Sequence, residues 1–127
     1  MKHSKFTPKK RIKSFSYAFA GLKLLLKEEH NIRILTVITI CTIALGFVLS
    51  LSLLEWVSVA IVIGLVYIAE TLNTAIERVA DFIHPENHDS IKNIKDIAAA
   101  AALVACIIAA AVGMIIFIPK LISMIIP

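Results

Sequence analysis

The sequence IAAAAALVACIIAAAVGMIIFIP, at residues 97–119, decides the fold of this 127-residue chain. It has 23 positions and no charged side chain. A helix needs about 20 such residues to cross the roughly 30 Å hydrocarbon core of a bilayer. The stretch therefore predicts a membrane-spanning helix, and the alanine run at residues 98–102 belongs to it.

A second uncharged stretch, at residues 34–54, has 21 positions. It begins too far from the amino terminus to be a cleavable signal peptide, and it lacks a short apolar core followed by a small-residue cleavage site. Hydrophobic residues make up 59% of the chain, against about 45–50% in soluble domains. Because a chain this short cannot bury so much apolar surface internally, we expect one all-α membrane domain over residues 1–127.

The remaining pattern predicts a third apolar helix between these two stretches. The link at residues 51–56 is short enough to join two antiparallel helices, with Trp56 at the membrane interface. Pro85 and its polar neighbours predict a loop at residues 82–94. The predicted spans are residues 34–54, 56–83 and 95–119. Cys41 and Cys106 lie in apolar runs without metal-ligand spacing, and we interpret both as buried packing residues.

The segment before the first span predicts an amphipathic helix over residues 8–28. Residues 1–7 are polar and expected to be loose, and Thr7 and Pro8 are typical of a helix start. Apolar side chains recur along one face at helical spacing: Ile12, Phe15, Phe19, Leu22 and Leu26. Lysines form a separate stripe at positions 9, 13, 23 and 27. A helix of this kind lies in the headgroup layer of a membrane.

Basic residues are concentrated at the amino end, where nine of the 13 lysines and arginines fall in residues 1–33. A basic arm can bind nucleic acid, but beside an apolar span the positive-inside rule explains it better, so no nucleic-acid partner is expected. The first link has no basic residue, the 77–96 segment has three and the tail has Lys120. This distribution predicts a cytoplasmic amino terminus and 77–96 loop, with the carboxyl terminus outside.

Four polar residues interrupt the apolar pattern of the second span: Glu70, Asn73, Glu77 and Asp81. At about 100° per residue, their spacings of 3, 4 and 4 place them within an arc of about 80° and along about 16 Å of one helix face. A carboxylate in a span is costly and persists only where it faces protein, water or a cation. The row therefore predicts a metal ion or a cationic ligand.

Further charged groups are expected at the same depth. Lys95 and Asp96 begin the third span, and the segment Glu28–Arg33 precedes the first. Carboxylates from separate helices with a lysine suit magnesium and a polyphosphate, and Glu70 could act as general base toward a hydroxyl at the membrane edge. The alternative is a set of polar residues that only joins helices. The histidines at positions 84 and 88 are separated by Pro85 and are not expected to ligate a metal.

Several catalytic motifs are missing from the chain. Its four glycines cannot form a P-loop or a kinase glycine-rich loop. No arrangement of serine, histidine and aspartate suggests an acyl hydrolase. Phosphoryl transfer by this chain must therefore use carboxylates, a metal and lysine.

The segment ETLNTAIERVAD at residues 70–81, with Lys95-Asp96 and small residues downstream, resembles the signature of the prokaryotic diacylglycerol kinase family. That signature reads E-x-x-N-S/T-A-I-E-x-x-x-D followed by K-D and small residues. The segment EEHNIR at residues 28–33 is similar to the acidic segment of the family, and YAFAGL at residues 17–22 to its surface helix. The resemblance covers nearly the whole chain and implies a homotrimer of three-span subunits in a bacterial plasma membrane, with active sites between neighbours.

The resemblance also implies roles for individual residues. Glu70 matches the catalytic base, and Asn73 supports the reaction centre. Glu29 and Glu77 match the carboxylates that hold Mg²⁺ with ATP. The remaining matches bind nucleotide: Asp81, Lys95, Asp96, Tyr17, Glu86, Asn87 and His88. An arginine of the family near the chain start aligns with Lys10 or, one place off, with Arg11.

The family contains kinases of two lipid alcohols, undecaprenol and diacylglycerol. The segment at residues 31–33 and the lysine-rich amino end are more similar to the Gram-positive undecaprenol kinases. The five residues at 98–102 are all alanine and offer a small apolar surface without the hydrogen-bond donors that the ester carbonyls of diacylglycerol would favour. We therefore expect undecaprenol as the lipid, with diacylglycerol as the alternative. An alternative of another class is a non-catalytic membrane subunit that conducts protons or cations along the polar row.

Overall fold

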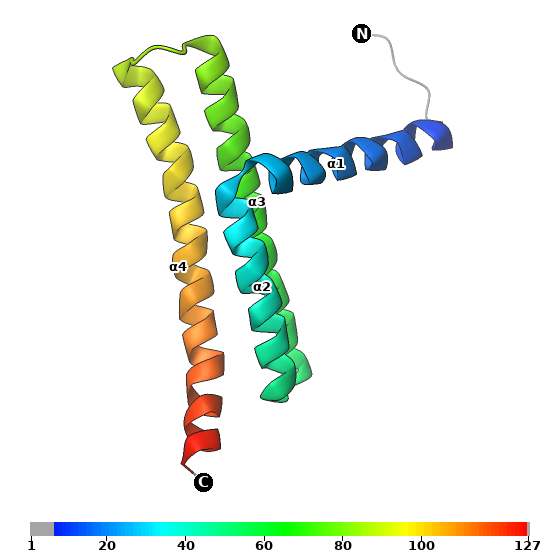
Figure 1. Cartoon of the computed structure of the whole chain (residues 1–127), viewed down its shortest axis with the longest axis vertical. Helices are drawn as coiled ribbons and strands as arrows, with labels where there is room; N and C mark the ends of the chain where they lie inside the picture. The colour runs from blue at the N-terminus through cyan, green and yellow to red at the C-terminus, as the bar shows by residue number, and fades with distance from the viewer. Residues whose placement is uncertain (1–6, 127) are drawn as a thin grey trace.

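The computed structural model describes residues 7–126, which form four helices and no strand (Figure 1). These are α1 (Pro8–Glu28), α2 (His30–Val48), α3 (Leu53–Ile83) and α4 (Asp89–Ile125). The last three are each long and apolar enough to cross a membrane. The prediction of an all-α chain with three candidate spans is therefore confirmed. The expectation of a loose amino-terminal segment falls, for residues 1–6, outside the described residues.

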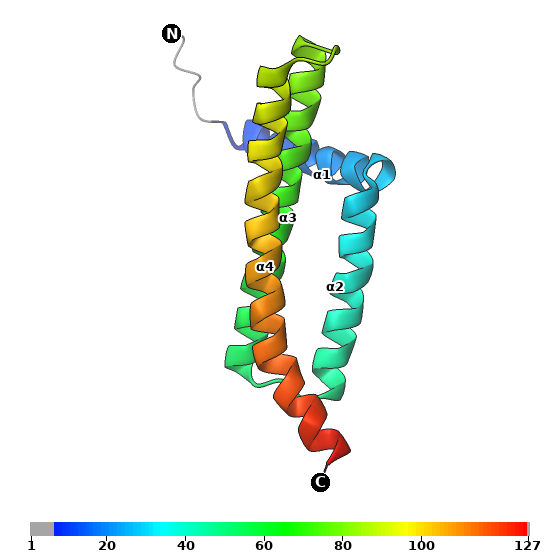
Figure 2. The ribbon, with the colours of Figure 1, turned by 90° about the vertical axis from the view of Figure 1, so that its left-hand side faces the viewer.

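Helices α3 and α4 pack against each other along much of their length, and this pair makes most of the tertiary contacts (Figures 1 and 2). Ala98, Ala102 and Ala105 are buried on one face of α4. Small side chains at this spacing let two helix backbones approach closely. Helix α2 makes fewer contacts with α3, and α1 leaves the three long helices at a steep angle (Figure 1).

The chain has little core of its own. One small cluster is buried, formed by Leu51, Val59 and Ile116, while most large aliphatic side chains on the described helices are exposed. The prediction that Cys41 and Cys106 are buried was wrong for the single chain, because both are exposed. Surfaces of this kind must be covered by lipid or by other chains.

Helix α2 ends six residues earlier than predicted, at Val48. Ser50 adopts a left-handed conformation with φ of 51°, and the N–H of Leu51 donates to the carbonyl of Gly46 at 3.1 Å. Ser52 then starts α3 through a capping box with Glu55. A capping box satisfies two helix-start N–H groups at once, so it begins a new helix at the end of the uncharged stretch of residues 34–54.

Helix α4 is longer than the predicted span of 95–119 at both ends, and the loop is reduced to residues 84–88. The His88 side chain caps the start by accepting a hydrogen bond from the Ser90 N–H at 3.2 Å. Pro119 lies inside the helix instead of ending it, and the last turns of α4 lean away from the turns before them in Figure 2. Proline causes such a bend because it lacks an N–H and its ring crowds the preceding turn.

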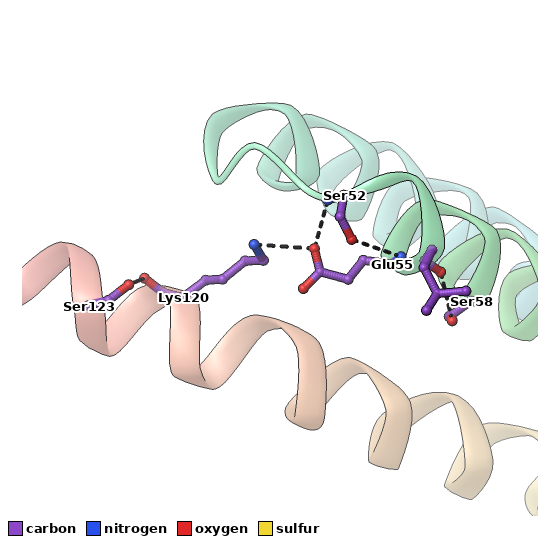
Figure 3. Close-up of polar contacts among 6 residues, drawn as sticks. Ser52, Glu55, Ser58, Lys120 and Ser123 are labelled. Carbon is purple, nitrogen blue, oxygen red and sulfur yellow. Dashed lines mark hydrogen bonds and ion pairs between the residues drawn. The ribbon is translucent and has the colours of Figure 1, made fainter.

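The end of α4 is joined to the α2–α3 turn by an ion pair (Figure 3). Lys120 Nζ lies 3.2 Å from Glu55 Oε2, and the same oxygen accepts a hydrogen bond from the Ser52 N–H at 2.7 Å. This contact fixes α4 to the start of α3 at the end of the molecule opposite the α3–α4 loop.

Candidate active site

The polar row of α3 lies partly inside the α3–α4 contact. Asn73 is buried, whereas Glu70 and Glu77 are half-buried and Asp81 is exposed. Asn73 Nδ2 donates a hydrogen bond to Glu77 Oε1 at 3.1 Å, as expected for residues four apart on one helix face. Asn73 Oδ1 is buried without a hydrogen-bond partner among the described residues. A buried acceptor of this kind calls for a donor from a ligand or a water molecule.

A polar pocket of about 370 Å³ lies where α3 and α4 meet their connecting loop. Six residues that the sequence assigned to the nucleotide line it: Asp81, Glu86, Asn87, His88, Lys95 and Asp96. Lys95 Nζ donates to Asp81 Oδ1 at 2.8 Å, and Lys92 Nζ donates to Asp96 Oδ2 at 2.6 Å. Two lysines held by carboxylates in an open pocket offer positive charge to phosphate oxygens.

Glu70 borders a second hollow, of about 300 Å³, with Asn31 of α2 on its other side. Four apolar residues of this hollow also line a larger cavity of about 350 Å³ between α2 and the α3–α4 pair: Leu35, Ile38, Val66 and Cys106. The larger cavity is almost entirely apolar. Because the two hollows share these four residues, Glu70 lies close to a mainly apolar cavity.

Glu29 occupies the bend between α1 and α2, where it is the carboxyl cap of one helix and the amino cap of the next. Arg78 of α3 donates from Nη2 to Glu29 Oε1 at 2.6 Å and to Glu28 Oε2 at 2.9 Å. Within residues 7–126 no group of three metal-ligating side chains is present. Oxygen donors such as Glu29 and Glu77 fit the preference of magnesium, but one chain does not bring a complete set together.

Two other predicted residues are not brought to the pocket within one chain. Lys10 and Tyr17 lie in the first half of α1, which extends away from the α3–α4 pair (Figure 1). Tyr17 is 66% exposed. In the alanine stretch Ala98 and Ala102 are buried and serve helix packing. The three alanines at residues 99–101 are exposed and leave a small apolar surface.

Comparison with known proteins identifies the chain at family level. Residues 16–117 match the family described as prokaryotic diacylglycerol kinase. The chain belongs to this family. It is 36% identical over 109 residues to the undecaprenol kinase of Bacillus subtilis strain 168, covering 86% of this chain and 89% of that protein. It is 37% identical over 112 residues to a diacylglycerol kinase of Synechocystis, covering 87% and 64% of the two chains. A diacylglycerol kinase of Helicobacter pylori strain 26695 is 32% identical over 99 residues, covering 78% and 77%.

Membership of the prokaryotic diacylglycerol kinase family makes the chain a membrane lipid kinase with ATP as co-substrate. This result favours the enzyme over a non-catalytic subunit that conducts protons or cations.

Three residues that contact or lie beside predicted site residues were not assigned a role from the sequence: Asn31, Arg78 and Lys92. Lys92 could have been found, because it lies one helical turn before Asp96 and i,i+4 pairs of opposite charge attract each other. Arg78 had a weaker signal. It is the one basic residue between positions 34 and 91, so the acidic pair Glu28–Glu29 is a reasonable partner.

Proposed function

We propose that this lipid kinase transfers the γ-phosphoryl group of ATP to undecaprenol. The observation that carries the proposal is the apolar cavity that shares four lining residues with the hollow beside Glu70. A long isoprenoid alcohol has one polar group, its terminal hydroxyl. That hydroxyl would reach Glu70 while the hydrocarbon chain occupies apolar space.

The cavity offers few hydrogen-bond donors to a lipid that carries polar groups along its length. The hydroxyls of Thr39 and Thr42, which line it, donate to carbonyls of their own helix at 2.8 Å each. The ester carbonyls of diacylglycerol would lose hydrogen bonds to water there without a replacement. The similarity to the undecaprenol kinase of Bacillus subtilis supports the same choice.

The proposed reaction is an in-line displacement at phosphorus. Glu70 accepts the proton of the lipid hydroxyl as the hydroxyl oxygen forms a bond to the γ-phosphorus. The bond from that phosphorus to the bridging oxygen of ADP breaks, and ADP leaves with the electron pair. Asn73 would hold Glu77 in place during the reaction through its hydrogen bond.

The nucleotide is proposed to bind in the polar pocket at the α3–α4 loop. Asp81, Lys95 and Asp96 line it, and Lys10 and Tyr17 would reach it from α1 of another subunit. Magnesium bound with ATP would neutralise phosphate charge, held by Glu77 and by Glu29 of the partner subunit. Because one chain lacks a complete ligand set, a homotrimer with sites between subunits fits the proposal.

The proposed orientation follows the basic residues. The single domain of residues 1–127 would sit in a bacterial plasma membrane with the α3–α4 loop and the amino terminus in the cytoplasm, where ATP is available. The carboxyl terminus would then lie outside. Helix α1 has no buried residue in the chain, which suits an amphipathic helix lying at the cytoplasmic membrane surface.

The test is a direct competition between lipids. Purified protein receives labelled ATP with undecaprenol and diacylglycerol at matched mole fraction in one detergent, and the products are separated. We expect a kcat/KM at least about tenfold higher for undecaprenol, since each unpaired polar group in an apolar site costs about 1–3 kcal/mol. A higher kcat/KM for diacylglycerol would reverse the lipid assignment and leave the kinase activity intact.

A further inference from the structure

Arg78 joins the bend between α1 and α2 to the carboxyl-terminal part of α3. A single guanidinium nitrogen, Nη2, contacts Glu28 at 2.9 Å and Glu29 at 2.6 Å. These two residues are about 50 positions away in sequence, and they are the last residue of α1 and the residue between the helices. The three side chains therefore form one charged cluster that spans three helices.

The cluster has a geometry that suits positioning. Glu29 has extended backbone angles, φ −98° and ψ 116°, so the chain changes direction at this residue. Its side chain is 28% exposed, against 43% for Arg78. The ion pair engages Oε1 of Glu29, and Oε2 has no hydrogen bond or ion pair among residues 7–126. A carboxylate held by one oxygen can still bind a cation through the other.

Arg78 also lies next to Glu77 in sequence, on a neighbouring face of α3. Glu77 is held by Asn73, and Glu29 is held by Arg78. Each carboxylate to which we assign the metal therefore has its own hydrogen-bond donor on α3. Donors of this kind fix the orientation of metal ligands and tune metal affinity.

We propose that Arg78 is a positioning residue that presents Glu29 to the magnesium of the neighbouring active site. The inference rests on the proposed metal role of Glu29. Arg78 acts through Glu29 and does not touch lipid, nucleotide or metal. By also holding Glu28 it fixes the angle at which α1 leaves α2, which keeps Glu29 at a constant place beside α3.

The competing explanation is a surface ion pair without function. Exposed ion pairs contribute about 0–1 kcal/mol to stability, so their loss leaves ligand binding unchanged. A positioning donor behaves differently, because its loss typically weakens metal binding by about 10–100-fold. Metal affinity measured without turnover therefore separates the two explanations.

The experiment measures Mn²⁺ binding by electron paramagnetic resonance, with Mn²⁺ in place of Mg²⁺ and a non-transferable ATP analogue bound to the full-length protein in detergent. Arg78→Gln should weaken Mn²⁺ binding by at least about tenfold. Lys120→Gln is the matched control, because it breaks an ion pair of similar exposure at the opposite end of the molecule. It should bind Mn²⁺ as the wild type does.

Arg78→Lys keeps the charge but replaces the guanidinium fork by one ammonium. Its Mn²⁺ affinity should fall between those of the wild type and Arg78→Gln, and it tests the proposal even where Arg78→Gln does not fold. Glu29→Gln separates the proposed metal role of Glu29 from the proposed positioning role of Arg78. If the Arg78 variants bind Mn²⁺ as the wild type does while Glu29→Gln binds it weakly, only the positioning role of Arg78 is wrong. If Glu29→Gln itself binds Mn²⁺ as the wild type does, the assignment of Glu29 to the metal is wrong.

Discussion

Glu70 and Asn73 lie one turn apart on α3, but their surroundings differ. Asn73 is 8% exposed and is fixed by its hydrogen bond to Glu77. Glu70 is half-buried, borders the hollow shared with Asn31 and forms no ion pair within residues 7–126. A carboxylate without a charged partner beside an apolar cavity can accept a proton from a bound hydroxyl. Asn73 is therefore suited to holding Glu77, and Glu70 is suited to proton transfer.

Replacing Glu70 by glutamine tests the proton transfer. The substitution keeps size and polarity but removes the proton acceptor, and loss of a general base typically lowers the rate by about 10²–10⁴-fold. We expect kcat to fall by this factor while binding of a fluorescent ATP analogue stays within about twofold of wild type, because the nucleotide pocket does not include Glu70. Turnover close to wild type would remove Glu70 from the mechanism.

Residue spacing predicted some site contacts and could not predict others. The steps of three and four residues on one helix anticipated that Asn73 and Glu77 would meet, because helix geometry fixes such neighbours. The antiparallel order of α3 and α4 placed Lys95 at the level of Asp81, and the structure adds the ion pair between them. The partner of Arg78 could not be predicted, since it depends on the angle between α1 and α2. The catalytic and binding roles of these residues stay predictions.

The turn between α2 and α3 depends on one close contact. Trp56 packs against Phe47 with ring centroids 4.9 Å apart, and its ring covers Gly46. A Cβ added at Gly46 would lie 2.6 Å from the Cη2 atom of Trp56. Real side chains do not approach so closely, so glycine is required here for packing, and the left-handed residue of the turn is Ser50.

Gly46→Ala should therefore destabilise the protein. Overpacking of this kind costs about 1–3 kcal/mol, which thermal unfolding in detergent would detect as a lower Tm. Gly21→Ala is the control, because no atom lies within 4 Å of a Cβ added there, and its Tm should not fall. A second substitution, Trp56→Leu, should restore part of the lost stability in the Gly46→Ala background. Equal Tm values for Gly46→Ala and wild type would show that the Trp56 contact is not limiting.

Helix ends were the elements least accessible to sequence reasoning. Hydropathy located all three long helices, since length and apolar composition decide membrane spans. It could not place the α2–α3 turn, because residues 49–54 are as apolar as the helix before them and the break comes from local hydrogen bonds of Ser52 and Glu55. At residues 49–54 the predicted helix was too long, whereas at Pro119 it was too short. The proline was expected to end α4, yet the helix continues to Ile125 because the apolar residues beyond it continue to favour a helix.

The molecule as a whole looks incomplete as a single chain. Its described helices bury few large side chains, and α1 buries none. Six assigned residues line the nucleotide pocket, but Lys10, Tyr17 and Glu29 are not among its lining residues. Closed cyclic symmetry, in which each subunit gives one surface and receives another, would complete every site in the same way. Sequence patterns cannot predict this arrangement directly, because it concerns contacts between chains.

Mixing two inactive variants tests the shared site. In the proposed trimer each site combines α3 of one subunit, with Glu77, and the bend of its neighbour, with Glu29. A random equal mixture of Glu29→Gln and Glu77→Gln subunits should therefore leave about a quarter of the sites of a cyclic trimer without a lesion, and about a quarter of wild-type activity should return. Glu70→Gln mixed with Glu77→Gln is the control. Both of these residues lie on α3, so every site keeps one lesion and no activity should return. Equal recovery in the two mixtures, or none in the first despite proven subunit exchange, would exclude a site divided between α3 and the neighbouring bend.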